Sequence, residues 1–170
     1  MAERLESAVG QSLIAIGLYT VAFESMVLSF RGGMHGYLKA NDPGSFASFL
    51  KACDTADKTF KFCAPKLVNL GVIEDADVRR LNEMRKRRNT FAHEGYDEMM
   101  SLTVSDVEPD VLLMLRIARK VERWMPAQAR RDVGGTGHLF SISPAIFGMY
   151  MQVARKIAHS KLPLEQDDVT

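Results

Sequence analysis

Apolar residues recur every three or four positions along most of this chain, and no stretch longer than a few residues alternates as an exposed strand would. This spacing is typical of amphipathic helices, whose buried side chains lie on one stripe. The first such stripe contains Leu5, Val9, Leu13, Ile16, Thr20, Phe23, Val27 and Phe30. The sequence therefore predicts an all-α protein.

Helix start and stop signals divide the pattern into a bundle of about five helices. Arg31-Gly32-Gly33 is expected to interrupt the first helix, because glycine lowers helix stability. Pro65 is expected to kink the second helix or end it early, and Gly95 to stop the third, which Asp75 or Asp77 caps. The expected helices span residues 3–30, 45–67, 75–94, 105–125 and 143–158, with a glycine-rich loop over residues 126–143.

Length and composition are those of one globular domain. We expect residues 1–170 to form a single domain whose acidic tail, residues 162–170, is frayed. A hydrophobic fraction of 46% excludes a disordered chain. Because the net charge is only +1, a nucleic-acid-binding surface would require basic residues clustered on one part of the protein. Cys53 and Cys63 are expected to be core thiols, too far apart along one helix to bridge, and we expect no metal or cofactor.

The segment from Ser12 to Phe30 carries a single charge, Glu24, and is nearly long enough to cross a bilayer. Several small or polar residues interrupt its apolar character, and the apolar stripe follows helical spacing, which favours a helix buried in a bundle or dimer. The N-terminus lacks the basic and apolar regions of a secretory signal. We therefore expect a cytoplasmic protein that does not contact a membrane.

Arg88 lies on the apolar face of the third expected helix, with Leu81, Met84 and Phe91. A guanidinium there can pair with a buried acid, for which Glu24 is the obvious partner, or can bind a phosphate. His93 titrates near neutral pH, so it can remove the proton from a ribose 2′-hydroxyl while Arg88 holds the phosphate. Such a pair would cut RNA without metal, leaving a 2′,3′-cyclic phosphate and a 5′-hydroxyl.

The spacing of the two residues predicts a dimeric site. Five residues along a helix separate Arg88 and His93 by about 140°, so one copy does not aim both side chains at one point. If two copies pack about this helix across a two-fold axis, both arginines and both histidines can line one cleft.

The motif Arg88-Asn89-Thr90-Phe91-Ala92-His93 resembles the Arg-polar-x-His signature of the HEPN superfamily. Members of this superfamily are helical bundles that typically dimerise, and many are metal-independent ribonucleases of toxin–antitoxin, abortive-infection and other defence systems. The resemblance implies that Arg88 and His93 are catalytic and that Asn89 supports them. It also implies an RNA substrate, a homodimer and a restraining antitoxin protein.

Each of these residues also has a structural interpretation. Glu24 and Arg88 can form an ion pair with no catalytic role, and His93 can cap the helix as a cation. Glu94 is a surface residue or a group that raises the pKa of His93. The basic residues beside the motif contact an RNA backbone or form a solvated face; they are Arg85, Lys86 and Arg87. The alternative function is accordingly a non-catalytic helical interaction or regulatory protein.

Overall fold

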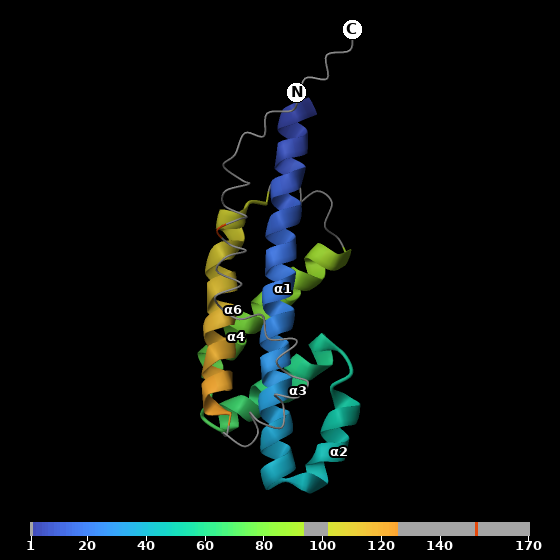
Figure 1. Ribbon diagram of the computed structural model, residues 1–170, viewed down its shortest axis with the longest axis vertical. Coiled ribbons are helices and arrows are strands. Elements are labelled where there is room, and N and C mark those ends of the chain that lie inside the picture. The colour runs from blue at the N-terminus through green and yellow to red at the C-terminus, as the bar shows by residue number, and fades with distance from the viewer. Residues whose placement is uncertain (1, 94–101, 126–151, 153–170) are drawn as a thin grey trace.

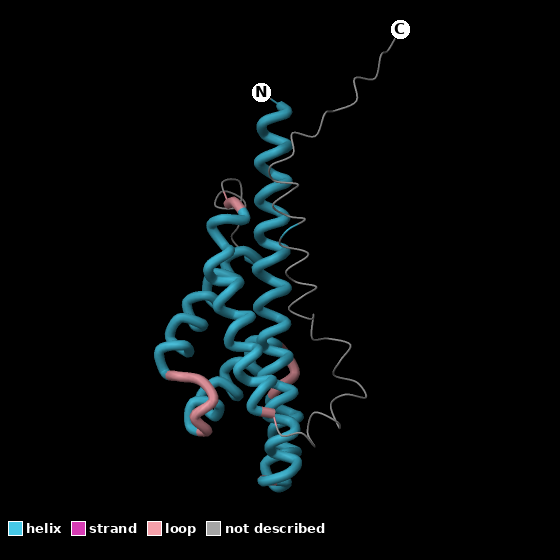
Figure 2. The backbone as a smooth tube through the Cα atoms, turned by 60° about the vertical axis from the view of Figure 1, so that its left-hand side comes forward, coloured by secondary structure: helices cyan, strands magenta, loops and turns pink. Residues whose placement is uncertain are grey.

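The computed structural model describes residues 2–93, 102–125 and 152, and in this part the chain is an all-α bundle without strands (Figure 1). The predicted fold class is therefore confirmed. Figure 2 shows the described chain as helices joined by short loops. The helices are α1 (Ala2–Asn41), α2 (Pro43–Ala52), α3 (Ala56–Asn69), α4 (Asp75–His93) and α6 (Val104–Trp124).

Helix α1 forms the centre of the bundle. It packs most extensively on α6 and also contacts α2, α3 and α4 (Figure 1). Two of its serines meet α6 or the residues just before it: the Ser12 hydroxyl donates to the Leu102 carbonyl oxygen (2.9 Å) ahead of α6, and the Ser29 hydroxyl donates to Glu122 Oε1 (2.9 Å) within it. The largest fully buried side chains of α1 are Tyr19, Phe23, Met26, Phe30 and Met34.

The segment Val9–Asn41 of α1 is long and apolar enough to cross a membrane, judged by length and composition. Half of the most apolar 18-residue stretch of this segment is nevertheless buried inside the bundle. The core helix of a bundle meets the same two criteria, and the hydrogen bonds from Ser12 to Leu102 and from Ser29 to Glu122 of α6 are contacts expected of a core helix.

The expected interruption at residues 31–33 is wrong, because α1 continues without a break to Asn41. Gly33 lies at a close approach of α1 and α6: a Cβ added to it would stand 2.8 Å from Val121 Cγ1 and 3.6 Å from the Trp124 ring. Met34 and Leu38, beyond the glycines, are both buried. Packing of these side chains therefore outweighs the low helix propensity of glycine.

The single helix expected over residues 45–67 is two helices. Asp42 Oδ1 accepts a hydrogen bond from the Ser45 N–H (3.1 Å) and starts α2, and Thr55 Oγ1 accepts one from the Lys58 N–H (3.3 Å) and starts α3. Pro65 lies inside α3 and does not end it. The break between α2 and α3 also places Cys53 and Cys63 in different elements.

Cys53 caps the C-terminus of α2 and Cys63 lies within α3, so their separation along one helix axis does not apply. Both are free and buried, as expected of core thiols. Burial raises the pKa of both thiols, and the nearby Cys53 thiol raises that of Cys63 further. The prediction that the two lie in one helix is therefore wrong, whereas the prediction that they form no disulfide is confirmed.

The predicted start of the fourth expected helix is also shifted. Helix α6 begins at Val104 behind Thr103, whose N–H donates to Asp106 Oδ2 (2.8 Å), and Pro109 lies inside it. Apolar spacing from Leu115 predicts that Leu112 is also buried, but it is 54% exposed, because the buried stripe passes through its neighbour Val111. Gly95, the loop over residues 126–143, the helix over residues 143–158 and the tail over residues 162–170 fall outside the described residues.

Candidate functional site

The motif occupies the last turns of α4, which places Arg88 beside the core. Leu81, Met84 and Phe91 are buried, as their spacing predicts, and the Arg88 side chain on the same face is 27% exposed. The helix starts after Gly71, whose φ of 68° favours glycine, and Asp77 Oδ2 accepts from the Glu74 N–H (3.3 Å). Local turn chemistry and the apolar stripe together therefore fix which way Arg88 points.

Two contacts hold the Arg88 guanidinium. Its Nη2 lies 2.5 Å from Glu24 Oε1, so the expected partner in α1 is present, and its Nη1 donates to Asn89 Oδ1 (3.2 Å). Glu24 is itself 38% exposed. A guanidinium has further N–H donors, and at this partly exposed position they can meet phosphate oxygens.

A cluster around the preceding residue, Arg87, joins α4 to both α1 and α6. Arg87 Nη1 lies 3.1 Å from Asp110 Oδ2, and its guanidinium stacks over the rings of Tyr19 and Phe91 at 5.7 and 5.6 Å. The Tyr19 hydroxyl lies 3.2 Å from the Met84 carbonyl oxygen and 3.4 Å from Asp110 Oδ2. Burial, reinforced by the Asp110 charge, raises the pKa of Tyr19. These contacts fix the turn that carries Arg88.

Sequence reasoning missed both Tyr19 and Asp110. Asp110 shares the buried face of α6 with Val107 and Met114, which is the same signal that singles out Arg88 on α4. A charged residue on an apolar face predicts a partner on the facing helix, and Arg87 is that partner.

The three basic residues expected to contact an RNA backbone point in different directions. Arg85 pairs with Asp57 of α3 and is only 18% exposed, Arg87 pairs with α6 as above, and Lys86 forms an exposed pair with Glu83 (2.9 Å). Burial would raise the pKa of Asp57, but hydrogen bonds from Lys61 and Arg85 outweigh it and lower that pKa. The three cations therefore do not form one surface.

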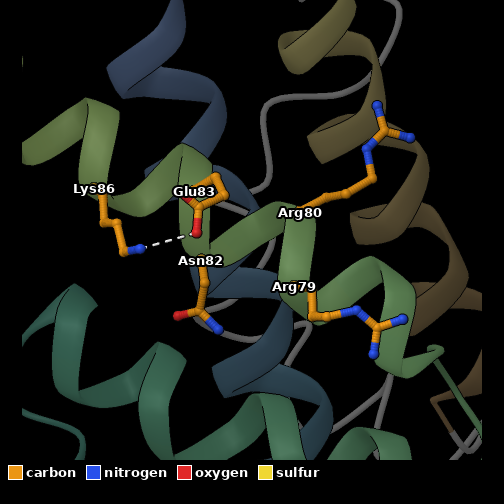
Figure 3. A pocket seen from close by; sticks show the side chains of 5 residues that line it. All are labelled: Arg79, Arg80, Asn82, Glu83 and Lys86. Carbon is orange, nitrogen blue, oxygen red and sulfur yellow. Dashed lines mark hydrogen bonds and ion pairs between the residues drawn. The ribbon is translucent and has the colours of Figure 1, made fainter.

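An open hollow of about 490 Å³ lies on the outer face of α4, on the turns before the motif (Figure 3). Its lining residues are Arg79, Arg80, Asn82, Glu83 and Lys86. Within the described part of the chain, no group of three or more His, Cys, Asp or Glu residues could hold a metal ion. The side chain of His93 and the whole of Glu94 lie outside the described residues.

Comparisons of the chain with protein-family models, with curated proteins and with solved structures find no match. The HEPN resemblance accordingly rests on the residues of the motif and on the helical fold that carries it.

Proposed function

We propose that this protein is a metal-independent endoribonuclease of the HEPN type. The observation that carries the proposal is the placement of Arg88: Glu24 and Asn89 orient its guanidinium at a partly exposed position, five residues before His93. An oriented arginine together with a histidine, a residue type that ordinarily titrates near neutral pH, is the smallest set of groups that can cleave RNA through its own 2′-hydroxyl.

In the proposed reaction His93 takes the proton of the 2′-hydroxyl, whose oxygen attacks the adjacent phosphorus. Arg88 stabilises the charge that develops on the phosphate oxygens, and the bond to the 5′-oxygen breaks. The products are a 2′,3′-cyclic phosphate and a 5′-hydroxyl, the latter completed by a proton returned from the site. Asn89 positions Arg88, because its side-chain oxygen accepts a hydrogen bond from the guanidinium.

The proposal includes a homodimer in the cytoplasm. Two copies pair about their α4 helices, so that Arg88 and His93 of each copy reach the same cleft. A ribonuclease acting on cellular RNA requires restraint, so an antitoxin protein is the expected further partner. Light scattering of the full chain should give the mass of two copies. If a monomer cleaves RNA, the proposal that two copies share one cleft is refuted.

The direct test is cleavage of labelled RNA in excess chelator, with the product ends resolved. The parent should cleave and leave a 2′,3′-cyclic phosphate, whereas His93→Ala should lose cleavage and keep its fold. His159→Ala, the same exchange outside the motif, is the control and should cleave as the parent does. Cleavage retained by His93→Ala would refute the assignment.

A second candidate is a non-catalytic interaction or regulatory protein of the same fold. The observation that favours it is again the Glu24–Arg88 pair, because a carboxylate and a neighbouring amide already give this guanidinium structural partners. This candidate predicts that the parent cleaves no RNA and that Arg88→Ala lowers the thermal unfolding temperature. Normal stability of that variant would count against it.

A further inference from the structure

We propose that α4 and α6 together form a surface that binds the phosphate backbone of RNA without reading its sequence. We call it the α4–α6 basic face and define it by Arg79 and Arg80 of α4 and Arg116 and Arg119 of α6. The choice of RNA as the polyanion rests on the proposed ribonuclease function. The face itself rests on the following geometry.

Two ion pairs show that α4 and α6 run antiparallel. Asp77 Oδ2 lies 3.1 Å from Lys120 Nζ, and ten residues further along α4 Arg87 lies 3.1 Å from Asp110, ten residues earlier in α6. Arg80 follows Asp77 by about one helical turn, and Arg116 precedes Lys120 by about one turn in the same direction. Arg80 and Arg116 therefore lie at the same level of the two helices.

The arginines of this face are exposed, and no ion pair within the described residues engages any of the four. Two nearby acids are already matched: Asp77 pairs with Lys120, and Glu83 pairs with Lys86, while Asp75, one turn before Arg79, forms no ion pair with it in the described part of the chain. Figure 3 shows Arg79 and Arg80 leaving the same turn of α4 around the hollow, while Glu83 is turned to Lys86. Positive charge at this face is therefore left without an internal counter-ion.

Along α6 the basic residues form one stripe, because residues three, four and seven apart share a helix face. The stripe consists of Arg116, Arg119, Lys120 and Arg123. It lies opposite the buried residues Val107, Met114 and Val121, so it faces away from the core. Two adjacent helices thus present guanidinium groups on one side of the bundle.

Phosphate oxygens are the chemistry that fits this face. A guanidinium offers a planar fork of donors that matches phosphate, and neutralising phosphates releases bound counterions. No aromatic side chain lines the hollow, so it has no platform on which a base could stack. Backbone contact without base stacking predicts strong salt dependence and little sequence preference.

The test measures binding of a fluorescent 2′-O-methyl RNA to the full chain by anisotropy, as a function of salt. This RNA keeps its phosphates but lacks the 2′-hydroxyl, so binding is read without cleavage. The variants are Arg79→Gln/Arg80→Gln and Arg116→Gln/Arg119→Gln. The matched control is Arg31→Gln/Lys51→Gln, which removes two exposed charges at the α1–α2 end and lowers the net charge equally, from +1 to −1.

Each face variant should weaken binding about 25-fold at 0.1 M salt and reduce the salt slope by about 1.4, because each lost single-strand phosphate contact contributes about 0.7. The control should bind within about twofold of the parent. The proposal is overturned if the face variants bind as the parent does, if the control weakens equally, or if the parent does not bind this RNA. Equal competition by polyglutamate would also overturn it, since the face would then suit an acidic peptide.

Failure here is separable from failure of the ribonuclease proposal. His93→Ala should bind this RNA more tightly than either face variant does, because it leaves the basic face intact. If the parent binds RNA through this face but does not cleave it, the catalytic proposal is refuted and the proposed basic face stands. If the parent cleaves RNA and the face variants bind as tightly as the parent, the proposed basic face is refuted and the catalytic proposal stands.

Discussion

Gly33→Ala and Gly17→Ala make the same change in the same helix and should have opposite effects on stability. Both glycines lie in the interior of α1, where alanine is intrinsically the better helix former. They differ in surroundings. A Cβ at Gly17 would meet nothing within 4 Å, whereas a Cβ at Gly33 would stand 2.8 Å from Val121 Cγ1, on a fully buried side chain.

At Gly17 the propensity gain should be realised in full, about 0.8–1.0 kcal/mol. At Gly33 the same gain is offset by overpacking, which costs about 1–3 kcal/mol, so the variant should be about 0–2 kcal/mol less stable than the parent. Val121 is β-branched and cannot rotate freely away from the contact. The two alanine variants should therefore differ by about 1–3 kcal/mol.

Urea unfolding followed by circular dichroism gives the free energy of unfolding of each variant, provided that the m-value is unchanged. Val121→Ala supplies an internal control, because it removes the methyl that the new Cβ would meet. Gly33→Ala should then cost less in the Val121→Ala background than in the parent. If Gly33→Ala stabilises the parent as much as Gly17→Ala does, α1 and α6 are not packed as closely as the structure has them.

Two pH predictions follow from shifted pKa values. Burial and Asp110 raise the pKa of Tyr19, so its neutral hydroxyl stabilises the folded state. This contribution to the free energy of unfolding is complete below the ordinary pKa of 10.0. It is lost as pH rises through the folded value, by up to about 1.4 kcal/mol per pH unit. Urea midpoints at pH 8 and 11 should fall less for Tyr19→Phe than for the parent, and an equal fall would contradict the assignment. Pairing with Lys61 and Arg85 lowers the pKa of Asp57, so its carboxylate stabilises the folded state. This contribution to the free energy of unfolding is present above the ordinary pKa of 3.8 and is lost as pH falls through the folded value. Asp57→Asn should cost about 1–2 kcal/mol at pH 7 and converge with the parent at low pH, and a gap that persists in acid would contradict this cause.

The sequence predicts the fold class and the neighbourhood of Arg88 because both depend on helical periodicity. The stripe through Leu81, Met84 and Phe91 is buried as its spacing requires, and the only charge in the central part of α1, Glu24, is the partner of Arg88. A lone charge on each of two facing apolar helix faces leaves few alternatives for pairing. This part of the site was therefore accessible from the sequence.

Helix boundaries were harder to predict because local and tertiary preferences disagree. At Gly33 local propensity predicts a break, but the close approach of Val121 makes glycine the residue that lets the helix pack. At Thr55 the reverse holds: apolar spacing continues across the junction, while the threonine side chain caps a new helix. The capping signal is visible in the sequence, whereas the packing of Gly33 depends on α6 and is not.

The Glu24–Arg88 pair serves either proposed function, and stability and activity separate its two roles. Both side chains are partly exposed, so their coupling energy in a double-mutant cycle of Glu24→Gln and Arg88→Ala should be only about 1 kcal/mol. Arg88→Lys keeps the charge but loses the planar fork. If the pair is structural, unfolding energies should track the loss of this coupling, and RNA cleavage should be absent throughout.

If the pair orients a catalytic arginine, Arg88→Lys should stay within about 1 kcal/mol of the parent in stability while losing most of kcat. Glu24→Gln should then lower kcat with little change in RNA affinity, because its carboxylate acts on the guanidinium and not on the substrate. A Glu24→Gln variant that cleaves at the parent rate would show that Arg88 needs no orientation. The ion pair would then belong to the fold alone.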